Sequence, residues 1–276
     1  PYTVLRVSMQ VFAEDGTRIH ARVNERQHVD AVVLIHGFPF SESIWEAQSD
    51  ALARDACVVC PDLRGAGKSG ESEGPYLMET LAADVALLLD ALGIERASIA
   101  GHSMGGYVAL AFARMFTERV NRLALVPSRL RADTPREAQA RRELADRIER
   151  KESIEPVVES MLPRLFAPST PAERPNVIER AYEIVRRNAP GGAAAALRGM
   201  ALRSSAEDIA EDLDVPMVMI AGARDATLAQ EEAREIVGRF PRGRLIVCEQ
   251  SGHLPMMEEP ELVTQALRQW LKETLI

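Results

Sequence analysis

The chain has 276 residues, of which 46% are hydrophobic and 27% are charged, and its formal net charge is −8. This size and composition are typical of one large or two small globular domains with a full core. The acidic balance argues against a nucleic-acid or anionic-membrane surface. No apolar run approaches the roughly 18 residues of a membrane span. We therefore expect neither nucleic acid nor a membrane among the partners.

The first residues and the cysteines indicate the compartment. Residues 1–6 lack the apolar core of a signal peptide, so we expect a cytoplasmic protein. The three cysteines, Cys57, Cys60 and Cys248, are too few and odd in number for a disulfide framework. Cys57 and Cys60 form a C-x-x-C pair inside an apolar strand pattern, whereas redox pairs lie at a helix start. We interpret them as packing residues and expect no metal and no cofactor.

The chain begins with patterns of a sheet. Residues 4–12 and 18–23 alternate as strands do, and residues 14–17 between them have the composition of a hairpin turn. Residues 31–35 and 56–60 are continuous apolar runs, which are typical of parallel strands buried on both faces. The first strands therefore form a hairpin next to a buried parallel sheet.

Helices alternate with strands in the following part of the chain. Helical patterns cover residues 43–54, with Ser43 as a candidate cap, and residues 77–92, with Gly93 as a left-handed stop. Strands are predicted over residues 97–100 and 120–126. This alternation predicts a right-handed, doubly wound parallel sheet.

The pattern changes after Pro127. Residues 128–212 contain no strand pattern, and three predicted capping boxes begin at Thr134, Thr170 and Ser205. We predict an all-helical cap, residues 128–212, inserted into a core formed by residues 1–127 and 213–276. Prolines and the Pro-Gly-Gly run at 190–192 separate its expected helices, which lie near 135–151, 154–165, 172–187 and 192–202. Such an insertion belongs over the C-terminal edge of the sheet, where α/β proteins bind ligands.

Strands and helices alternate again at the end of the chain. Strands are predicted over residues 216–221 and 244–248, and helices over residues 230–240 and 258–275. The complete prediction is an α/β fold with an eight-stranded, mostly parallel sheet flanked by helices.

One loop imitates a nucleotide-binding motif. Residues 67–69, Gly-Lys-Ser, match the last three residues of a phosphate-binding loop motif. The same motif requires glycine at position 62, where this chain has Asp62. No helix pattern follows directly. We interpret Asp62 and Arg64 as an internal ion pair or as groups that fasten the loop.

Residues 101–106, Gly-His-Ser-Met-Gly-Gly, form a G-x-S-x-G motif between a strand pattern and a helix pattern. In this context the serine sits on a sharp turn with its hydroxyl exposed, which makes Ser103 a candidate nucleophile. The alternative is a serine that caps the following helix.

Two more candidates follow strand ends. Asp225 and His253 come after the predicted strands 216–221 and 244–248, and the C-terminal ends of parallel strands share one sheet edge. A serine needs a base to remove its proton, an imidazole titrates near neutrality, and a carboxylate orients the imidazole. Asp133, which follows another strand, is the alternative acid.

An acyl transfer site also needs donors for the developing oxyanion. Backbone N–H groups of Met104, next to the candidate nucleophile, and of Phe38, in the loop after residues 31–35, are placed for this role.

Five motifs, at residues 36–39, 61–69, 101–106, 222–225 and 252–253, together resemble those of α/β-hydrolase fold enzymes in order and approximate spacing. The subgroup that the chain is similar to contains small cytoplasmic esterases, enol-lactonases, C–C bond hydrolases and cofactor-free perhydrolases. The resemblance implies a serine hydrolase with a helical cap after the sixth strand. A serine at position 103 argues against the dehalogenases and epoxide hydrolases of the family, which use aspartate.

The expected reaction is hydrolysis of a small carboxylic ester or lactone through an acyl-Ser103 intermediate. C–C bond hydrolysis, acyl transfer or perhydrolysis on the same three residues is the alternative, and a ligand-binding signalling homologue with slow turnover is an alternative of another class. The expected apolar pocket includes, besides the oxyanion-hole residues, Phe40, Trp45, Met161, Leu165 and Phe166, of which the last three also suit simple packing. Arg129 and Arg131 could reach an anionic substrate or form a solvated surface. Homo-oligomerisation is left open.

Overall fold

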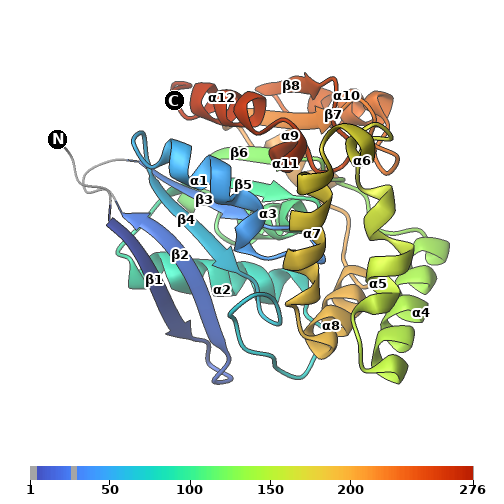
Figure 1. Cartoon of the computed structure of the whole chain (residues 1–276). Helices are drawn as coiled ribbons and strands as arrows, with labels where there is room; N and C mark the ends of the chain where they lie inside the picture. The colour runs from blue at the N-terminus through green and yellow to red at the C-terminus, as the bar shows by residue number, and fades with distance from the viewer. Residues whose placement is uncertain (1–4, 26–29, 276) are drawn as a thin grey trace.

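The computed structural model describes residues 5–25 and 30–275, which fold around one eight-stranded sheet with helices on both faces (Figure 1). The strand order is β1-β2-β4-β3-β5-β6-β7-β8. The pairs β1–β2 and β2–β4 are antiparallel, and every other neighbouring pair is parallel. The predicted α/β fold with a mostly parallel sheet of eight strands is therefore confirmed. The strands are β1 (Leu5–Phe12), β2 (Arg18–Glu25), β3 (Ala31–Ile35), β4 (Cys57–Asp62), β5 (Ala97–His102), β6 (Val120–Val126), β7 (Met217–Gly222) and β8 (Gly243–Cys248).

Burial explains the hydrophobic patterns of the strands. Every residue of β3, β4, β5, β6 and β7 is buried, whereas the edge strand β8 is mostly half-buried. The hairpin β1–β2 turns at Gly16, whose φ of +80° suits glycine. Cys60 lies inside β4, where burial raises the pKa of its thiol to about 12, which suits a packing residue.

Helices cover both faces of the sheet. α1 packs on α12 on one face, and α2 packs on α3 on the other (Figure 1). The predicted left-handed stop of α2 is observed at Gly93, with φ +67°. The helices outside the segment between β6 and β7 are η1 (Glu42–Trp45), α1 (Glu46–Leu52), α2 (Met78–Ala91), α3 (Met104–Met115), η2 (Thr117–Arg119), α10 (Gln230–Gly238), α11 (Pro255–Glu258) and α12 (Pro260–Trp270).

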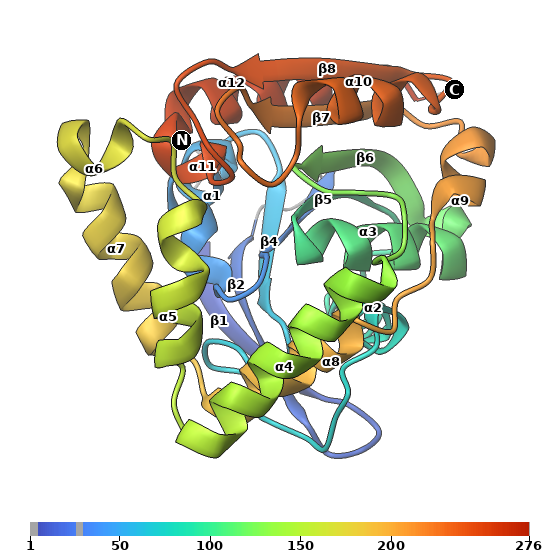
Figure 2. The same ribbon diagram turned by 90° about the vertical axis from the view of Figure 1, so that its right-hand side faces the viewer.

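Residues 128–212, all of them described, form helices without strands (Figure 2). Their buried apolar side chains join the same cluster as those of the sheet. We call this stretch the cap segment; its role as a lid stays a prediction. Its helices are α4 (Pro135–Lys151), α5 (Glu155–Ser160), η3 (Leu162–Arg164), α6 (Thr170–Glu173), α7 (Pro175–Arg186), α8 (Pro190–Met200) and α9 (Glu207–Asp212).

Several predicted helices are divided in the structure. The predicted helix 172–187 breaks at Arg174 and the predicted helix 258–275 breaks at Glu259, each directly before a proline. Proline disfavours the helical conformation of the preceding residue, so both residues leave the helical region. The predicted helix 154–165 becomes α5 and η3, and the predicted helix 43–54 becomes η1 and α1, with Ser41 in place of Ser43 at the cap position.

Of the three predicted capping boxes, one is confirmed and two are wrong. Thr134 forms a complete capping box with Glu137. The hydroxyl of Thr170 instead donates to Glu258, and the hydroxyl of Ser205 bonds with Glu207. The Pro-Gly-Gly run at 190–192 was expected to separate helices but begins α8, because proline is well suited to the first helical position.

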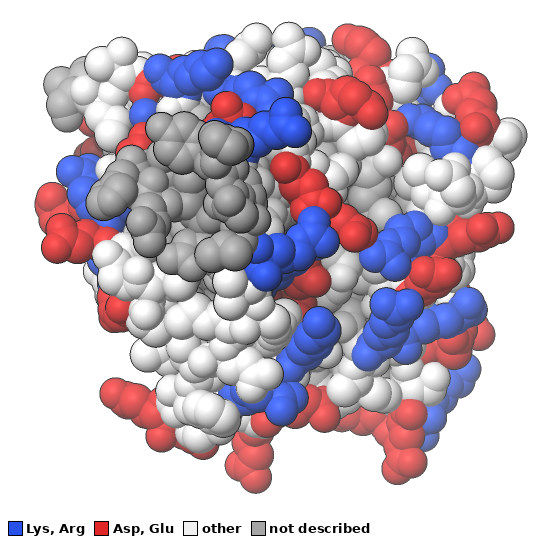
Figure 3. All heavy atoms as spheres, turned by 60° about the vertical axis from the view of Figure 1, so that its left-hand side comes forward, with Lys and Arg blue, Asp and Glu red and all other residues white. Residues whose placement is uncertain are grey.

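Basic and acidic side chains are interspersed on the face shown in Figure 3. Among the described residues, no helix combines the length and the apolar character needed to cross a membrane.

Candidate active site

The turn between β5 and α3 places Ser103 in a strained backbone conformation, with φ 51° and ψ −112°. The flanking glycines are required by close approach. A Cβ atom on Gly101 would overlap the carbonyl of Gly105, and one on Gly105 would overlap the carbonyl of Ile35. The motif thus lets the strand, the helix and the neighbouring strand β3 meet around one serine.

Ser103 occupies the N-cap position of α3, but its side chain forms no capping hydrogen bond. Its hydroxyl has no hydrogen-bond partner among residues 5–25 and 30–275. The backbone is held instead, because its N–H donates to the carbonyls of Val126 and Pro127 and its carbonyl accepts from Ser128. The capping alternative is therefore not observed, and the half-buried hydroxyl is unengaged.

Asp225 and His253 meet at the same sheet edge. The Nδ1 atom of His253 lies 2.7 Å from Oδ2 of Asp225, whose side chain is fully buried. Burial by itself would raise the pKa of Asp225. The charge of His253 and the hydrogen bonds from His253 and Thr227 outweigh burial and hold that pKa below its usual value. The carboxylate is thus ionised and faces Nδ1, which leaves Nε2 of the imidazole available.

Thr227 completes this arrangement and was not identified from the sequence. Its hydroxyl lies 2.7 Å from Oδ1 of Asp225 and 2.7 Å from Nδ1 of His253, and its N–H donates to the same Oδ1. The hydroxyl donates to the carboxylate and can accept from the imidazole. An aspartate followed two residues later by threonine suits such a turn, so a local signal existed.

Asp133, the alternative acid, is engaged elsewhere. Its carboxylate pairs with Arg141 at 2.6 Å and with Arg203 at 2.5 Å. Its side chain is buried between these two guanidinium groups. Within the described structure only Asp225, of the two acids, pairs with His253.

His102 connects the loop of His253 to the serine turn. Its Nε2 donates to the carbonyl of His253 at 2.9 Å, and the two rings are 5.1 Å apart. Burial lowers the pKa of His102 well below its usual value, so the ring is neutral. The structure therefore brings His253 to the residue that precedes Ser103. No Ser103–His253 hydrogen bond forms in the described residues, and such bonds are often long before substrate binds.

The loop of His253 is also fastened to the cap segment. The N–H of His253 donates to the carbonyl of Leu165 at 2.7 Å. The buried carboxylate of Glu258 accepts from the N–H groups of Gly252 and Ala167. From the sequence Glu258 is predicted only as a helix start, because its contact with Ala167 joins residues that are 91 positions apart.

Phe38 and Met104, the predicted oxyanion donors, line one narrow pocket. The N–H of Phe38 donates to no described residue. Met104 is the first residue of α3, and a helix offers no acceptor for the N–H at that position. His36 fixes the loop, because its Nε2 accepts from the N–H of Leu63 and its Nδ1 donates to the carbonyl of Gly37.

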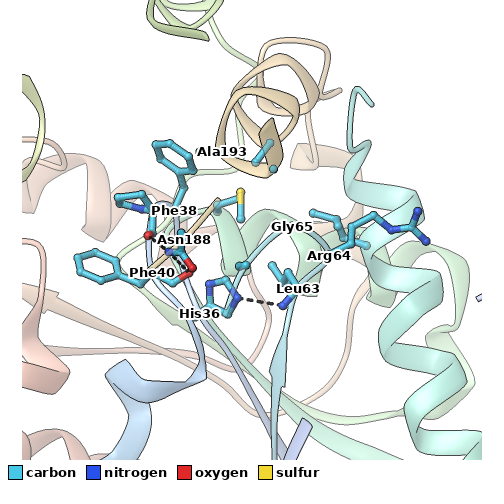
Figure 4. A pocket seen from close by; sticks show the side chains of 14 residues that line it. His36, Phe38, Phe40, Leu63, Arg64, Gly65, Asn188 and Ala193 are labelled. Atoms are coloured by element: carbon cyan, nitrogen blue, oxygen red, sulfur yellow. Dashed lines mark hydrogen bonds between the residues drawn. The ribbon is translucent and has the colours of Figure 1, made fainter. Parts of the chain in front are cut away.

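Figure 4 shows this pocket, with Phe38, Phe40 and Asn188 on one side and Leu63 and Gly65 on the other. Asn188, also missed from the sequence, donates to the carbonyl of Pro39 at 2.5 Å and accepts from the N–H of Gly67 at 2.8 Å. It therefore joins the cap segment to the loops after β3 and β4.

The remaining predicted pocket residues divide among different places. Met161 and Leu165 line a second cavity, of about 440 Å³. Trp45 and Phe166 are buried and line neither this cavity nor the pocket of Phe38. Phe166 packs its backbone against Gly252.

The basic residues considered from the sequence have internal partners. Arg129 pairs with Glu232, and Arg131 pairs with Glu137. The interpretation of Asp62 and Arg64 as a mutual ion pair is wrong, because Arg64 pairs with Asp84 and Asp15, and Asp62 bonds with His20. Both residues do fasten the loop, which leaves them no part in nucleotide binding.

The chain is similar to known esterases and enol-lactonases. 3-Oxoadipate enol-lactonase 2 of Acinetobacter baylyi is 26% identical over 242 residues, which are 88% of each chain. A thermophilic esterase from Thermogutta terrifontis, solved with malate bound, has a TM-score of 0.90 and 38% identity, covering 97% of this chain and 98% of its own. The enol-lactonase from Burkholderia xenovorans has a TM-score of 0.86 and 26% identity, covering 99% and 100%.

A family match accounts for most of the chain. Residues 30–260 match the family described as alpha/beta hydrolase fold, and this range runs from the residue before β3 to the start of α12. It includes the serine turn, the Asp225 loop and the His253 loop. The sheet order, the glycine-lined turn and this match lead to one conclusion: the chain belongs to the alpha/beta hydrolase fold family.

Proposed function

We propose that the chain is a serine hydrolase that cleaves a small carboxylic ester or lactone through an acyl-Ser103 intermediate. The observation that carries the proposal is the 2.7 Å hydrogen bond between Asp225 and Nδ1 of His253, made at the sheet edge that also bears the strained serine. An unengaged nucleophile, an oriented base and a buried carboxylate are the three parts that this chemistry needs.

In the first half of the reaction Nε2 of His253 removes the proton of Ser103 as its oxygen attacks the carbonyl carbon. Asp225 stabilises the resulting imidazolium. The N–H groups of Phe38 and Met104 donate to the developing oxyanion, and each such donor typically contributes about 2.7–4 kcal/mol. The imidazolium then returns its proton to the leaving alcohol oxygen, which stays attached to the acyl group when the substrate is a lactone.

In the second half, water takes the place of the alcohol. His253 removes a proton from water, which attacks the acyl carbon, and the carboxylic acid leaves as Ser103 regains its proton. The 38% identity to an esterase and the likeness to enol-lactonases support both ester and lactone as substrate classes.

The test is a steady-state assay of p-nitrophenyl acetate, p-nitrophenyl butyrate and a simple lactone. We expect Ser103→Ala to lose at least about a thousandfold in kcat. Ser205→Ala removes a hydroxyl that bonds only within its own turn and should retain full activity. If the native chain turns over no faster than Ser103→Ala, the proposal is wrong. A β-diketone and an alcohol acceptor in the same panel separate C–C cleavage and acyl transfer from hydrolysis.

A further inference from the structure

The cavity of about 440 Å³ is lined by residues of α4, α8 and the α5–η3 segment, together with Thr227. Its size falls within the range of small-molecule sites. One part of its wall is apolar, formed by Ala140, Leu144, Met161, Leu165 and Leu197. The rest is polar, formed by the hydroxyl residues Ser160 and Thr227 and by charged side chains.

Three guanidinium groups and one carboxylate line the cavity: Arg141, Arg147, Arg164 and Glu143. Arg141 is paired with Asp133 at 2.6 Å. Arg147 and Arg164 have no ion pair and no side-chain hydrogen bond with any described residue. Both are exposed at the rim, Arg147 from the face of α4 and Arg164 from η3.

The unpaired state of Arg147 contrasts with that of an arginine on the neighbouring helix, which is engaged. On the same helical pair, Arg198 of α8 pairs with Asp146 and Glu149 of α4. Arg147 lies between those two acids in the sequence yet pairs with neither. Two unpaired guanidinium groups against the single carboxylate of Glu143 leave the rim with excess positive charge.

Two residues of the cavity wall contact His253 of the candidate catalytic pair. Thr227 lines it and holds Nδ1 of His253 at 2.7 Å. Leu165 lines it and accepts from the N–H of His253 at 2.7 Å. The cavity wall thus combines two residues that contact His253 with two arginines that have no described partner.

We propose that Arg147 and Arg164 bind a carboxylate on the substrate, so that the preferred substrates are anionic esters or carboxylated lactones. Guanidinium groups suit this role because their paired N–H donors match the two oxygens of a carboxylate. The proposal rests on the proposed function of Ser103, whose substrate class it narrows.

The kinetic test compares mono-p-nitrophenyl adipate with p-nitrophenyl hexanoate, which carries a methyl group where adipate carries its carboxylate. In the native chain kcat/KM is higher for the anionic ester, and this preference falls as salt is added. In the double variant R147Q/R164Q the preference falls about tenfold or more, mainly through KM, while hydrolysis of the neutral ester is unchanged.

Arg150→Gln is the matched control. Arg150 lies on α4 near Arg147, is exposed, has no described partner and does not line the cavity. Its substitution removes one positive charge, as each of the two substitutions in R147Q/R164Q does, and should leave the preference unchanged. If R147Q/R164Q loses no more preference than R150Q, the proposal is overturned.

A binding measurement separates this proposal from the proposed function. Calorimetry with monomethyl adipate and with methyl hexanoate uses Ser103→Ala, with and without R147Q/R164Q. Monomethyl adipate binds more tightly than methyl hexanoate, and the two substitutions remove the difference. If the native chain shows no Ser103-dependent hydrolysis but this difference appears, the proposed function fails and the carboxylate site stands. If monomethyl adipate binds equally tightly with and without R147Q/R164Q, the carboxylate site is wrong, whether or not the chain hydrolyses esters.

Discussion

Ser103 has a positive φ, which costs a non-glycine residue about 1–3 kcal/mol. Hydrogen bonds and close contacts around Ser103 impose this backbone conformation. Its N–H donates to two carbonyls and its own carbonyl accepts from Ser128, while Gly101 and Gly105 permit the close contacts on either side. The result is a hydroxyl without a described partner, at the sheet edge where Nδ1 of His253 is shared between Asp225 and Thr227.

At this scale Thr227→Val should lower kcat about tenfold. The substitution keeps the shape but removes the hydroxyl that bonds to Asp225 and His253, and a hydrogen bond to a charged group is worth about 1.5–3 kcal/mol. Ester hydrolysis of the purified variant measures the effect. Thr227→Ser, which restores the hydroxyl, should restore most of kcat; equal losses in both variants would assign Thr227 a packing role.

Asp225 also has a consequence for stability against acid. The pKa of Asp225 in the folded state lies below its unfolded value of about 3.9. The ionised carboxylate therefore contributes fully to the free energy of unfolding above about pH 3.9, and this contribution is lost as the pH falls through the folded-state pKa. The free energy of unfolding should therefore fall more steeply between about pH 5 and pH 3 in the native chain than in Asp225→Asn. Urea unfolding followed by circular dichroism measures both slopes. Parallel slopes would mean that the pKa of Asp225 is unchanged on folding.

Among the elements, α8 and the residues before it hold the cap segment to the core. Asn188 bonds to the loops after β3 and β4, and the N–H of Gly192 donates to Glu71 at 2.5 Å. The N–H of Tyr76 donates to the carbonyl of Ala195. Glu258 fastens the middle of the cap segment at Ala167 and the loop of His253 at Gly252, so hydrogen bonds hold the elements around the site at a second place.

Gly199→Ala tests this attachment. A Cβ atom at Gly199 would overlap the carbonyl oxygen of Tyr76, so the substitution should lower the free energy of unfolding by about 1–3 kcal/mol. The matched control is Gly238→Ala in α10, where a Cβ atom meets nothing within 4 Å. It should be neutral or slightly stabilising, by at most about 1 kcal/mol. Thermal and urea unfolding measure the stability of both variants. Equal free energies of unfolding for Gly199→Ala and Gly238→Ala would contradict tight packing of α8.

Across the whole molecule, the features that the sequence predicts best are strands and turns, because a local pattern of residues encodes each of them. Continuous apolar runs indicate the buried strands, and the glycines at 101 and 105 indicate the turn of Ser103, because a side chain there cannot fit. Strand ends indicate where Asp225 and His253 meet. Helix breaks before prolines were missed because the predicted helices were extended across Pro175 and Pro260.

Contacts made by the tertiary fold could not be predicted in this way. Asn188 and Glu258 act on loops far away in the sequence, and the cavity arginines come from two helices whose relative position no periodicity reveals. The same limit explains the mistaken pairing of Asp62 with Arg64, since their true partners lie on other elements. The substrate class therefore depends on the assembled cap segment rather than on any motif.

The central claim is that Ser103 is the acylated nucleophile, and covalent labelling tests it most directly. A fluorophosphonate reacts with a serine that is activated by a neighbouring base and leaves one phosphonyl group on its oxygen. Intact-mass and peptide mass spectrometry of the labelled chain should find one added group, on the peptide that contains Ser103, and none in Ser103→Ala. Labelling of another residue, or equal labelling of Ser103→Ala, would contradict the account.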